Sequence, residues 1–125
     1  MHELAVTENI LRIAAKHAAD AGAERVTRLY LVVGQLSSIV DESVQFYWDM
    51  ISQGTIAQGA RLHFRRVPIE IDCLDCGLRY SPGKDDLACP RCFSTNVRIV
   101  SGEEFYLDSI EVEGQAAGEV STATA

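Results

Sequence analysis

The pattern of apolar and polar positions predicts two amphipathic helices in the first half of the chain. Between residues 4 and 21 the apolar side chains recur three or four positions apart, with charged residues between them: Leu4, Ile10, Leu11, Ala14, Ala18 and Ala21. This spacing predicts a helix that ends at Gly22. A second helix is predicted from Asp41 to the stop at Gly54, because an acidic first turn precedes apolar residues at helical spacing. Its apolar face comprises Val44, Tyr47, Trp48 and Ile51.

Further segments have the composition of strands, namely residues 25–34, 61–72, 97–100 and 105–112. The first is dense in β-branched side chains and ends at a glycine. In the second, the apolar side chains stand at even positions up to Phe64 and at odd positions from Val67 onward. This change of face predicts a bulge next to Pro68. Helices combined with strands in this order predict an α+β fold, in which the chain leaves a sheet before the cysteines and re-enters it after them.

Composition and charge narrow the classes of function. The chain has 125 residues, the length of one modest domain, and a formal net charge of −7, which disfavours binding to nucleic acid. No segment approaches the length of a membrane span, and the opening residues do not resemble a secretory signal, so we expect a cytoplasmic protein with no membrane partner. Residues 114–125 are small and polar, which predicts a disordered tail.

Two closely spaced cysteine pairs carry the strongest chemical signal. Twelve residues separate Cys73-x2-Cys76 from Cys89-x2-Cys92. A two-residue gap lets one tight turn direct two thiolates at a common centre, so two such turns can close a tetrahedral site. Four thiolates fill that site, and we therefore predict one structural metal ion, with zinc as the expected metal.

The cysteine ligand set alone leaves three interpretations open. A nucleic-acid-binding ribbon is disfavoured, because acidic residues oppose the basic ones between residues 73 and 98. A rubredoxin-like iron site for electron transfer uses the same ligands, although Phe93 stands where the second knuckle of rubredoxin has glycine. The third interpretation is a zinc-ribbon interaction module.

The amino terminus offers a second set of metal donors. His2 is too bulky for efficient removal of Met1, so the α-amine should remain on Met1. This amine, the amide nitrogen of His2 and its imidazole can form fused chelate rings on one ion, and Glu3 can supply a fourth ligand. Nitrogen-rich planar donors of this kind suit Ni(II) or Cu(II).

These motifs together resemble the HypA/HybF family of hydrogenase maturation proteins, which are nickel metallochaperones. The resemblance covers the chain up to the tail. It rests on Met1-His2-Glu3 opening a helix, Val33-Gly34 followed by Ser37 and the acidic start Asp41-Glu42, the paired cysteine knuckles, and Gly102-Glu103-Glu104 before the last strand.

The resemblance implies the roles of the two sites and the arrangement of the fold. Met1, His2 and Glu3 would bind Ni2+ as cargo, and Cys73, Cys76, Cys89 and Cys92 would bind a structural Zn2+. Nickel would pass to the precursor of a hydrogenase large subunit, alongside a partner GTPase. The implied fold has two helices on a three-stranded sheet with an inserted four-cysteine zinc-ribbon domain. The predicted domains are residues 1–70 completed by 103–113, the zinc ribbon 71–102, and the tail 114–125.

One departure from the family concerns the residues after the last cysteine. Some members have a histidine there, whereas this chain has Phe93-Ser94-Thr95-Asn96, so a nickel ligand from the zinc domain is not expected. We expect structural roles for His17 and His63, and a helix-dipole or docking role for Asp41. No nucleophile with a base, paired acid or phosphate-binding glycine loop is present, which predicts a carrier and not an enzyme.

Overall fold

The computed structural model describes residues 3–82, 86–114 and 118–122 and divides the chain into two compact units. The helix–sheet unit comprises Met1–Val32, Ser38–Arg65 and Tyr106–Ala125. The cysteine unit comprises Val33–Ser37 and Arg66–Phe105. The chain thus enters the cysteine unit twice, and the predicted boundaries at residues 71 and 102 fall inside that unit.

Both predicted helices are present in the helix–sheet unit. Helix α1 (Glu3–Asp20) buries Thr7, Ile10, Ala14 and Ala18, and Gly22 follows it with φ +72°. Helix α2 (Asp41–Ile51) buries Val44 and Trp48, and the indole N–H of Trp48 donates to the carbonyl of Ala60 at 3.2 Å. The two helices pack against each other. In the described part of the chain, neither helix is long and apolar enough to span a bilayer.

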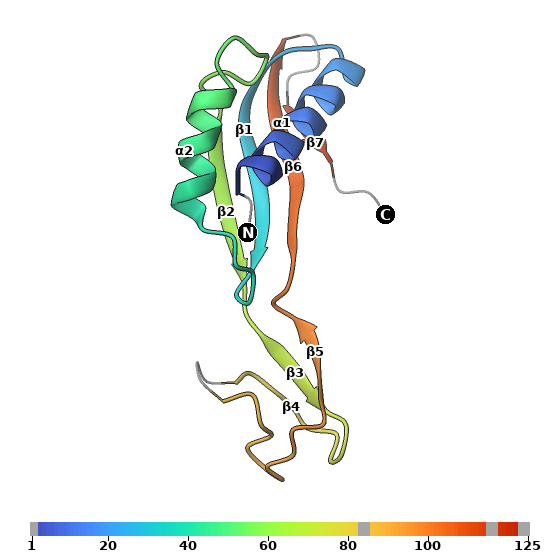
Figure 1. The fold of residues 1–125 in the computed structure, drawn as a ribbon. Helices are drawn as coiled ribbons and strands as arrows, with labels where there is room; N and C mark the ends of the chain where they lie inside the picture. The colour runs from blue at the N-terminus through green and yellow to red at the C-terminus, as the bar shows by residue number, and fades with distance from the viewer. Residues whose placement is uncertain (1–2, 83–85, 115–117, 123–125) are drawn as a thin grey trace. The chain divides into compact units, whose positions relative to one another are not determined.

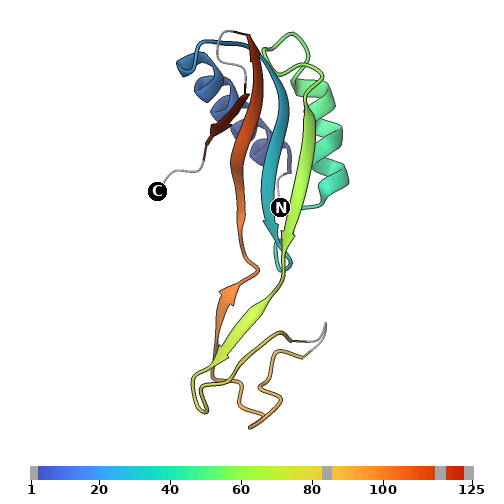
Figure 2. The same cartoon turned by 180° about the vertical axis from the view of Figure 1, so that it is seen from behind.

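A four-stranded sheet supports both helices. Its strands are β1 (Ala23–Gly34), β2 (Arg61–Val67), β6 (Phe105–Gly114) and β7 (Gly118–Ser121), in the order β2-β1-β6-β7. Strands β1 and β2 run in the same direction, with α2 as the crossover between them, and both helices cover one face (Figure 1). Figure 2 shows the other face of this sheet, which no helix covers. The α+β fold with two helices is therefore confirmed.

Strand β7 corrects the prediction that all of residues 114–125 are disordered. It pairs antiparallel with β6, with Ile110 opposite Val120 and Ser109 opposite Ser121. The hydroxyl of Thr122 donates to the carbonyl of Leu107 at 2.7 Å, and Thr122 is buried. Main-chain hydrogen bonds stabilise this strand with few apolar side chains, so composition gave no sign of it. The remainder of the predicted tail, residues 115–117 and 123–125, lies outside the described residues.

The cysteine unit contains a second, smaller sheet. Its strands are β3 (Glu70–Cys73), β4 (Arg79–Tyr80) and β5 (Val97–Ser101), in the antiparallel order β4-β3-β5. Ile71 is fully buried in it, and Cys73 lies opposite Val97. The predicted bulge near Pro68 is replaced by a break between β2 and β3, with a register shift at Glu70/Ile71. Proline explains the break, because it has no N–H to donate to a sheet.

Ion pairs join the three strands of this smaller sheet. Asp72 on the central strand accepts from Arg79 at 2.6 Å and from Arg98 at 3.3 Å. The hydrogen bond from Arg79 is the main reason why the pKa of Asp72 falls to about 2. Asp72 therefore stays ionised near neutral pH and can hold both neighbouring strands there.

Within the cysteine unit, Gly34 and Gly102 approach each other closely. Leu36 N–H donates to the carbonyl of Gly102 at 2.7 Å, and Gly34 N–H donates to the carbonyl of Glu104. A Cβ atom on Gly34 would lie 2.1 Å from the Gly102 oxygen. Only glycine fits at position 34, because the obstructing atom belongs to backbone.

Candidate metal centres

The structure brings the four predicted cysteine ligands together in the cysteine unit. Cys73 ends β3 and Cys76 follows in the next turn, while Cys89 and Cys92 lie in a second turn before β5. The Sγ atoms of Cys73 and Cys92 are 3.5 Å apart, as are those of Cys76 and Cys89, and all four lie within 4.8 Å of one another. A tetrahedral zinc site with Zn–S bonds of about 2.3 Å requires S–S separations of about 3.8 Å. The four-cysteine cluster therefore fits a zinc site.

Each turn also directs backbone N–H groups at the sulfurs. Cys76 N–H donates to Cys73 Sγ at 3.5 Å, and Arg91 N–H donates to Cys89 Sγ at 3.4 Å. Each turn closes through a residue with positive φ, Gly77 at +80° in the first and Phe93 at +62° in the second. The N–H groups of these two residues donate to the carbonyls of Cys73 and Cys89. Such N–H···S bonds orient thiolate ligands and stabilise their charge.

The surroundings of the sulfurs shift the pKa values of Cys76 and Cys92 in opposite directions. The backbone N–H of Leu78, with help from Arg91, lowers the pKa of Cys76 to about 6. The N–H of Ser94 lowers the pKa of Cys92, but partial desolvation of its sulfur and hydrogen bonds with the other three cysteines outweigh it and raise that pKa to about 12. A thiolate therefore forms more readily at Cys76 than at Cys92. A divalent cation at the centre would favour the thiolate form of the ligands.

Burial and ligand number indicate a structural role for this centre. Cys73 and Cys89 are buried, Cys76 is half-buried and Cys92 is exposed. Four protein ligands complete a tetrahedral shell, so no position remains for water or substrate. Within residues 3–82, 86–114 and 118–122, these cysteines are the one group of three or more possible metal ligands whose donor atoms lie close together.

The predicted amino-terminal site leads directly into α1. Met1 and His2 lie outside the described residues, whereas Glu3 is half-buried and is the first residue of the helix. The Glu3 carbonyl accepts from the hydroxyl of Thr7 at 2.6 Å, and Thr7 is fully buried. The buried face of the helix thus begins at Thr7, and the donors proposed for nickel precede Thr7 in the sequence.

Comparison with known proteins establishes the family. The sequence matches a family profile described as hydrogenase/urease nickel incorporation, metallochaperone, HypA, over residues 1–112. The chain belongs to the HypA family. This is the nickel metallochaperone family of hydrogenase maturation, as the resemblance in the sequence implies.

Individual relatives extend over nearly the whole chain. A hydrogenase maturation factor HypA of Dehalococcoides mccartyi is 39% identical over 116 residues, which cover 93% of this chain and 98% of the relative. The hydrogenase maturation factor HybF of Salmonella typhimurium is 35% identical over 113 residues, covering 90% of this chain and all of the relative.

Solved structures of HypA proteins share the fold. A solution structure of the Ni metallochaperone HypA from Helicobacter pylori aligns with a TM-score of 0.65 at 24% identity, over 92% of this chain and 100% of that one. A second solution structure of a HypA protein gives a TM-score of 0.69 at 25% identity, over 90% and 96% of the two chains. The α+β fold with a cysteine-bearing ribbon is therefore that of the HypA family.

The two other histidines occupy positions away from the start of α1. His17 is on the same helix, fourteen positions after Glu3, which corresponds to about 21 Å at about 1.5 Å per residue. His63 on β2 stacks on Tyr30, with ring centroids 5.1 Å apart, and the Tyr30 hydroxyl donates to Glu111. Tyr30 alternates with the buried Leu29 and Leu31, so this pair lies on the sheet face opposite the helices. Structural roles for both histidines agree with these positions.

Asp41 is the first residue of α2, where its carboxylate lies at the positive end of the helix dipole. This position fits the helix-dipole role expected for it.

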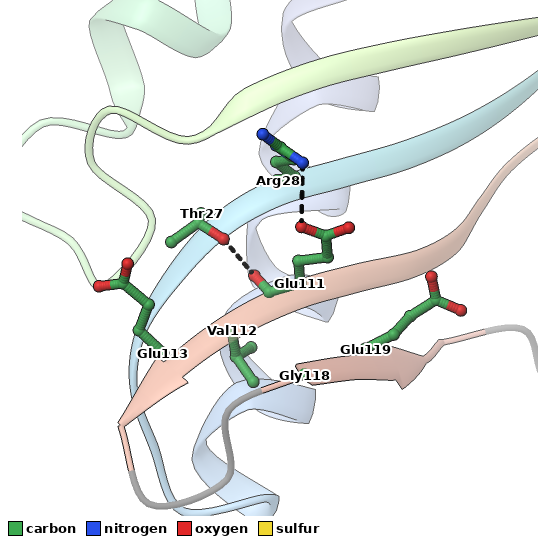
Figure 3. A pocket seen from close by; sticks show the side chains of 7 residues that line it. All are labelled: Thr27, Arg28, Glu111, Val112, Glu113, Gly118 and Glu119. Carbon is green, nitrogen blue, oxygen red and sulfur yellow. Dashed lines mark hydrogen bonds and ion pairs between the residues drawn. The ribbon is translucent and has the colours of Figure 1, made fainter.

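An open hollow of about 440 Å³ on the larger sheet contributes no metal site. Figure 3 shows Arg28 and Glu111 at this hollow, joined by an ion pair of 3.4 Å, with Glu119 on the neighbouring strand. Thr27 also donates to the Glu111 carbonyl. These contacts connect β1 with β6. The carboxylate of Glu111 is therefore paired with Arg28.

Sequence reasoning missed the role of Arg91. Its guanidinium donates to the carbonyl of Cys76 at 2.9 Å, which ties the second turn to the first. The hydrogen bond with Cys76 and the charge of the thiolates raise the pKa of Arg91. Its position inside the Cys89-x2-Cys92 motif was the available signal, because a cation there offsets thiolate charge.

Proposed function

We propose that this protein is a nickel metallochaperone that binds one Ni2+ at Met1, His2 and Glu3 and delivers it to the precursor of a [NiFe]-hydrogenase large subunit. A Zn2+ ion held by Cys73, Cys76, Cys89 and Cys92 stabilises the cysteine unit. The observation that carries this proposal is the family match over residues 1–112, which includes both sets of donors.

The chemistry of the amino terminus suits a cargo that must later leave. The α-amine, the amide nitrogen and the imidazole are nitrogen donors in a planar arrangement that favours Ni(II) over Zn(II). The thiolate cluster has the opposite preference, since soft sulfur ligands in a closed tetrahedron favour zinc. Two different ligand sets thus keep the cargo metal apart from the structural metal.

The position of the nickel donors also allows release. They precede Thr7, the first buried residue of α1, in the sequence, and we infer that the ion exchanges without opening the core. Neither site provides a catalytic group, and we assign the protein the role of a carrier that works with a nickel-insertion GTPase. The reduced cysteines suit the cytoplasm, where thiols persist.

A test in cells separates nickel delivery from other roles in maturation. A strain without this protein should contain hydrogenase large subunit that lacks nickel and is inactive. Raising the nickel concentration in the medium should restore activity in part, because mass action can replace a carrier that only concentrates its cargo. Activity that is normal without the protein, or absent at every nickel concentration, would contradict nickel delivery as its task.

A further inference from the structure

A row of charged side chains crosses the sheet face that no helix covers (Figure 2). Glu111 on β6 lies directly opposite Glu119 on β7, and Arg28 on β1 forms an ion pair with Glu111 at 3.4 Å. Figure 3 shows these side chains on three neighbouring strands. Arg28 is two residues from Tyr30 on β1, so it points to the uncovered face as Tyr30 does.

Arg61 extends this row to β2. Strands β1 and β2 are neighbours that run in the same direction, and the ring of His63 stacks on that of Tyr30 (Figure 1). Arg61 and Arg28 each come two residues before this stacked pair, so they lie side by side on the same face. Across β2, β1, β6 and β7 the charges of the row are therefore positive, positive, negative and negative.

The residue at each end of the row lies beside a like charge. Like charges directly opposite each other on neighbouring strands are destabilising. The ion pair between Arg28 and Glu111 offsets the two inner charges. Arg61 and Glu119 are exposed, and among the residues that the structure describes neither has an ion-pair partner. A surface with the same charges in reverse order would complement both ends.

A second copy of this chain carries such a surface. A two-fold axis parallel to the strands turns one uncovered face onto the other and reverses the strand order, so that β2 of one copy lies over β7 of the other, and β1 over β6. A two-fold axis that runs across the strands would instead place Arg61 over Arg61 and Glu119 over Glu119. The charges favour the first arrangement and oppose the second.

We propose that the uncovered sheet face is the interface of a two-fold symmetric homodimer, in which Arg61 of one protomer forms an ion pair with Glu119 of its partner. Sheets that pack face to face lie about 10 Å apart, a gap that an arginine and a glutamate reaching from opposite sheets can bridge. Tyr30, which is half-buried next to the row, adds aromatic surface to this interface. The interface uses none of the proposed metal ligands, so the dimer is independent of nickel delivery.

Charge reversal in the full-length chain tests this interface by sedimentation velocity at several protein concentrations. We expect the unaltered chain to form dimers that weaken as salt is raised. Arg61→Glu and Glu119→Arg each place two pairs of like charges in the interface, and each should weaken the dimer about 100-fold or more. Both variants should fold, because each new charge lies beside an opposite charge of its own chain, Arg28 or Glu111.

Arg12→Glu is the matched control for these variants. It makes the same change of net charge as Arg61→Glu, but on an exposed position of α1, which covers the other face of the sheet. We expect this variant to dimerise as the unaltered chain does. A loss of dimers as large as that in Arg61→Glu would show that net charge is responsible and would overturn the interface.

Mixing the two reversed variants tests the pairing itself. Opposite charges meet at both ends of the row when an Arg61→Glu chain faces a Glu119→Arg chain, so the mixture should form heterodimers although neither variant associates with itself. The double variant should dimerise for the same reason. An unaltered chain that stays monomeric at every concentration would overturn the interface. Dimers that both reversals leave intact, or a mixture that does not associate, would do so as well.

Discussion

Adding Gly-Ser in front of Met1 should abolish tight binding of one nickel ion. The extension converts the α-amine into a peptide nitrogen, which is much harder to deprotonate. His2→Ala should have the same effect because it removes the imidazole from the chelate. We expect each change to lower nickel affinity by more than about 100-fold, since even groups that only support a ligand are worth 10- to 100-fold. Calorimetry near neutral pH, in a weakly coordinating buffer, measures this loss.

The fold provides the controls for that experiment. Zinc content and helical circular dichroism should stay unchanged in both proteins, because the buried face of α1 begins at Thr7. His17→Ala should bind nickel normally, as His17 lies near the other end of the helix. Stoichiometric nickel binding that persists in both altered proteins would remove the amino-terminal site and direct attention to His17 and His63.

Cys73→Ala should reduce bound zinc from about one ion per chain to nearly none and unfold the cysteine unit. Cys73 is 2% exposed and belongs to both β3 and the cluster, so its loss opens the metal site and exposes three thiols. Structural zinc contributes about 10 kcal/mol or more to the folding of small domains, which a three-stranded sheet with few buried side chains cannot replace. Elemental analysis and limited proteolysis of the cysteine unit measure the two effects.

The helix–sheet unit should survive this change. It has its own core, in which Leu29, Val44 and Trp48 are fully buried, so most of the helical circular dichroism should remain. Leu87→Ala is a suitable control, because Leu87 is a 40%-exposed residue of the cysteine unit. Complete loss of the helical signal in Cys73→Ala would show that one cooperative transition covers both units and would contradict their independence.

The features that the sequence predicts best are those set by residues a few positions apart in the chain. Helical spacing identifies α1 and α2 because one face of each helix is buried, and Val44 and Trp48 on the predicted face of α2 are indeed fully buried. The two-residue gaps within the cysteine pairs likewise predict the cluster, since a single turn determines the geometry of each pair.

Features that depend on contacts between distant segments were not predictable in the same way. Strand β7 exists because β6 offers unpaired main-chain groups, and nothing in Gly118–Ser121 itself requires a strand. The contact of Gly34 with Gly102 is equally invisible in the local sequence. The sequence did show that Phe93 replaces a glycine, but only the structure shows that its backbone adopts the glycine conformation with the ring exposed.

Elemental analysis of the untagged protein after titration with nickel tests the account most directly. We predict one zinc and one nickel per chain, with the zinc retained throughout and the nickel bound only during the titration. Iron in the cysteine cluster, seen as a reddish and redox-active protein, would indicate a rubredoxin-like electron carrier. A colourless zinc protein that binds no nickel would leave a zinc-ribbon interaction module and contradict the proposed function.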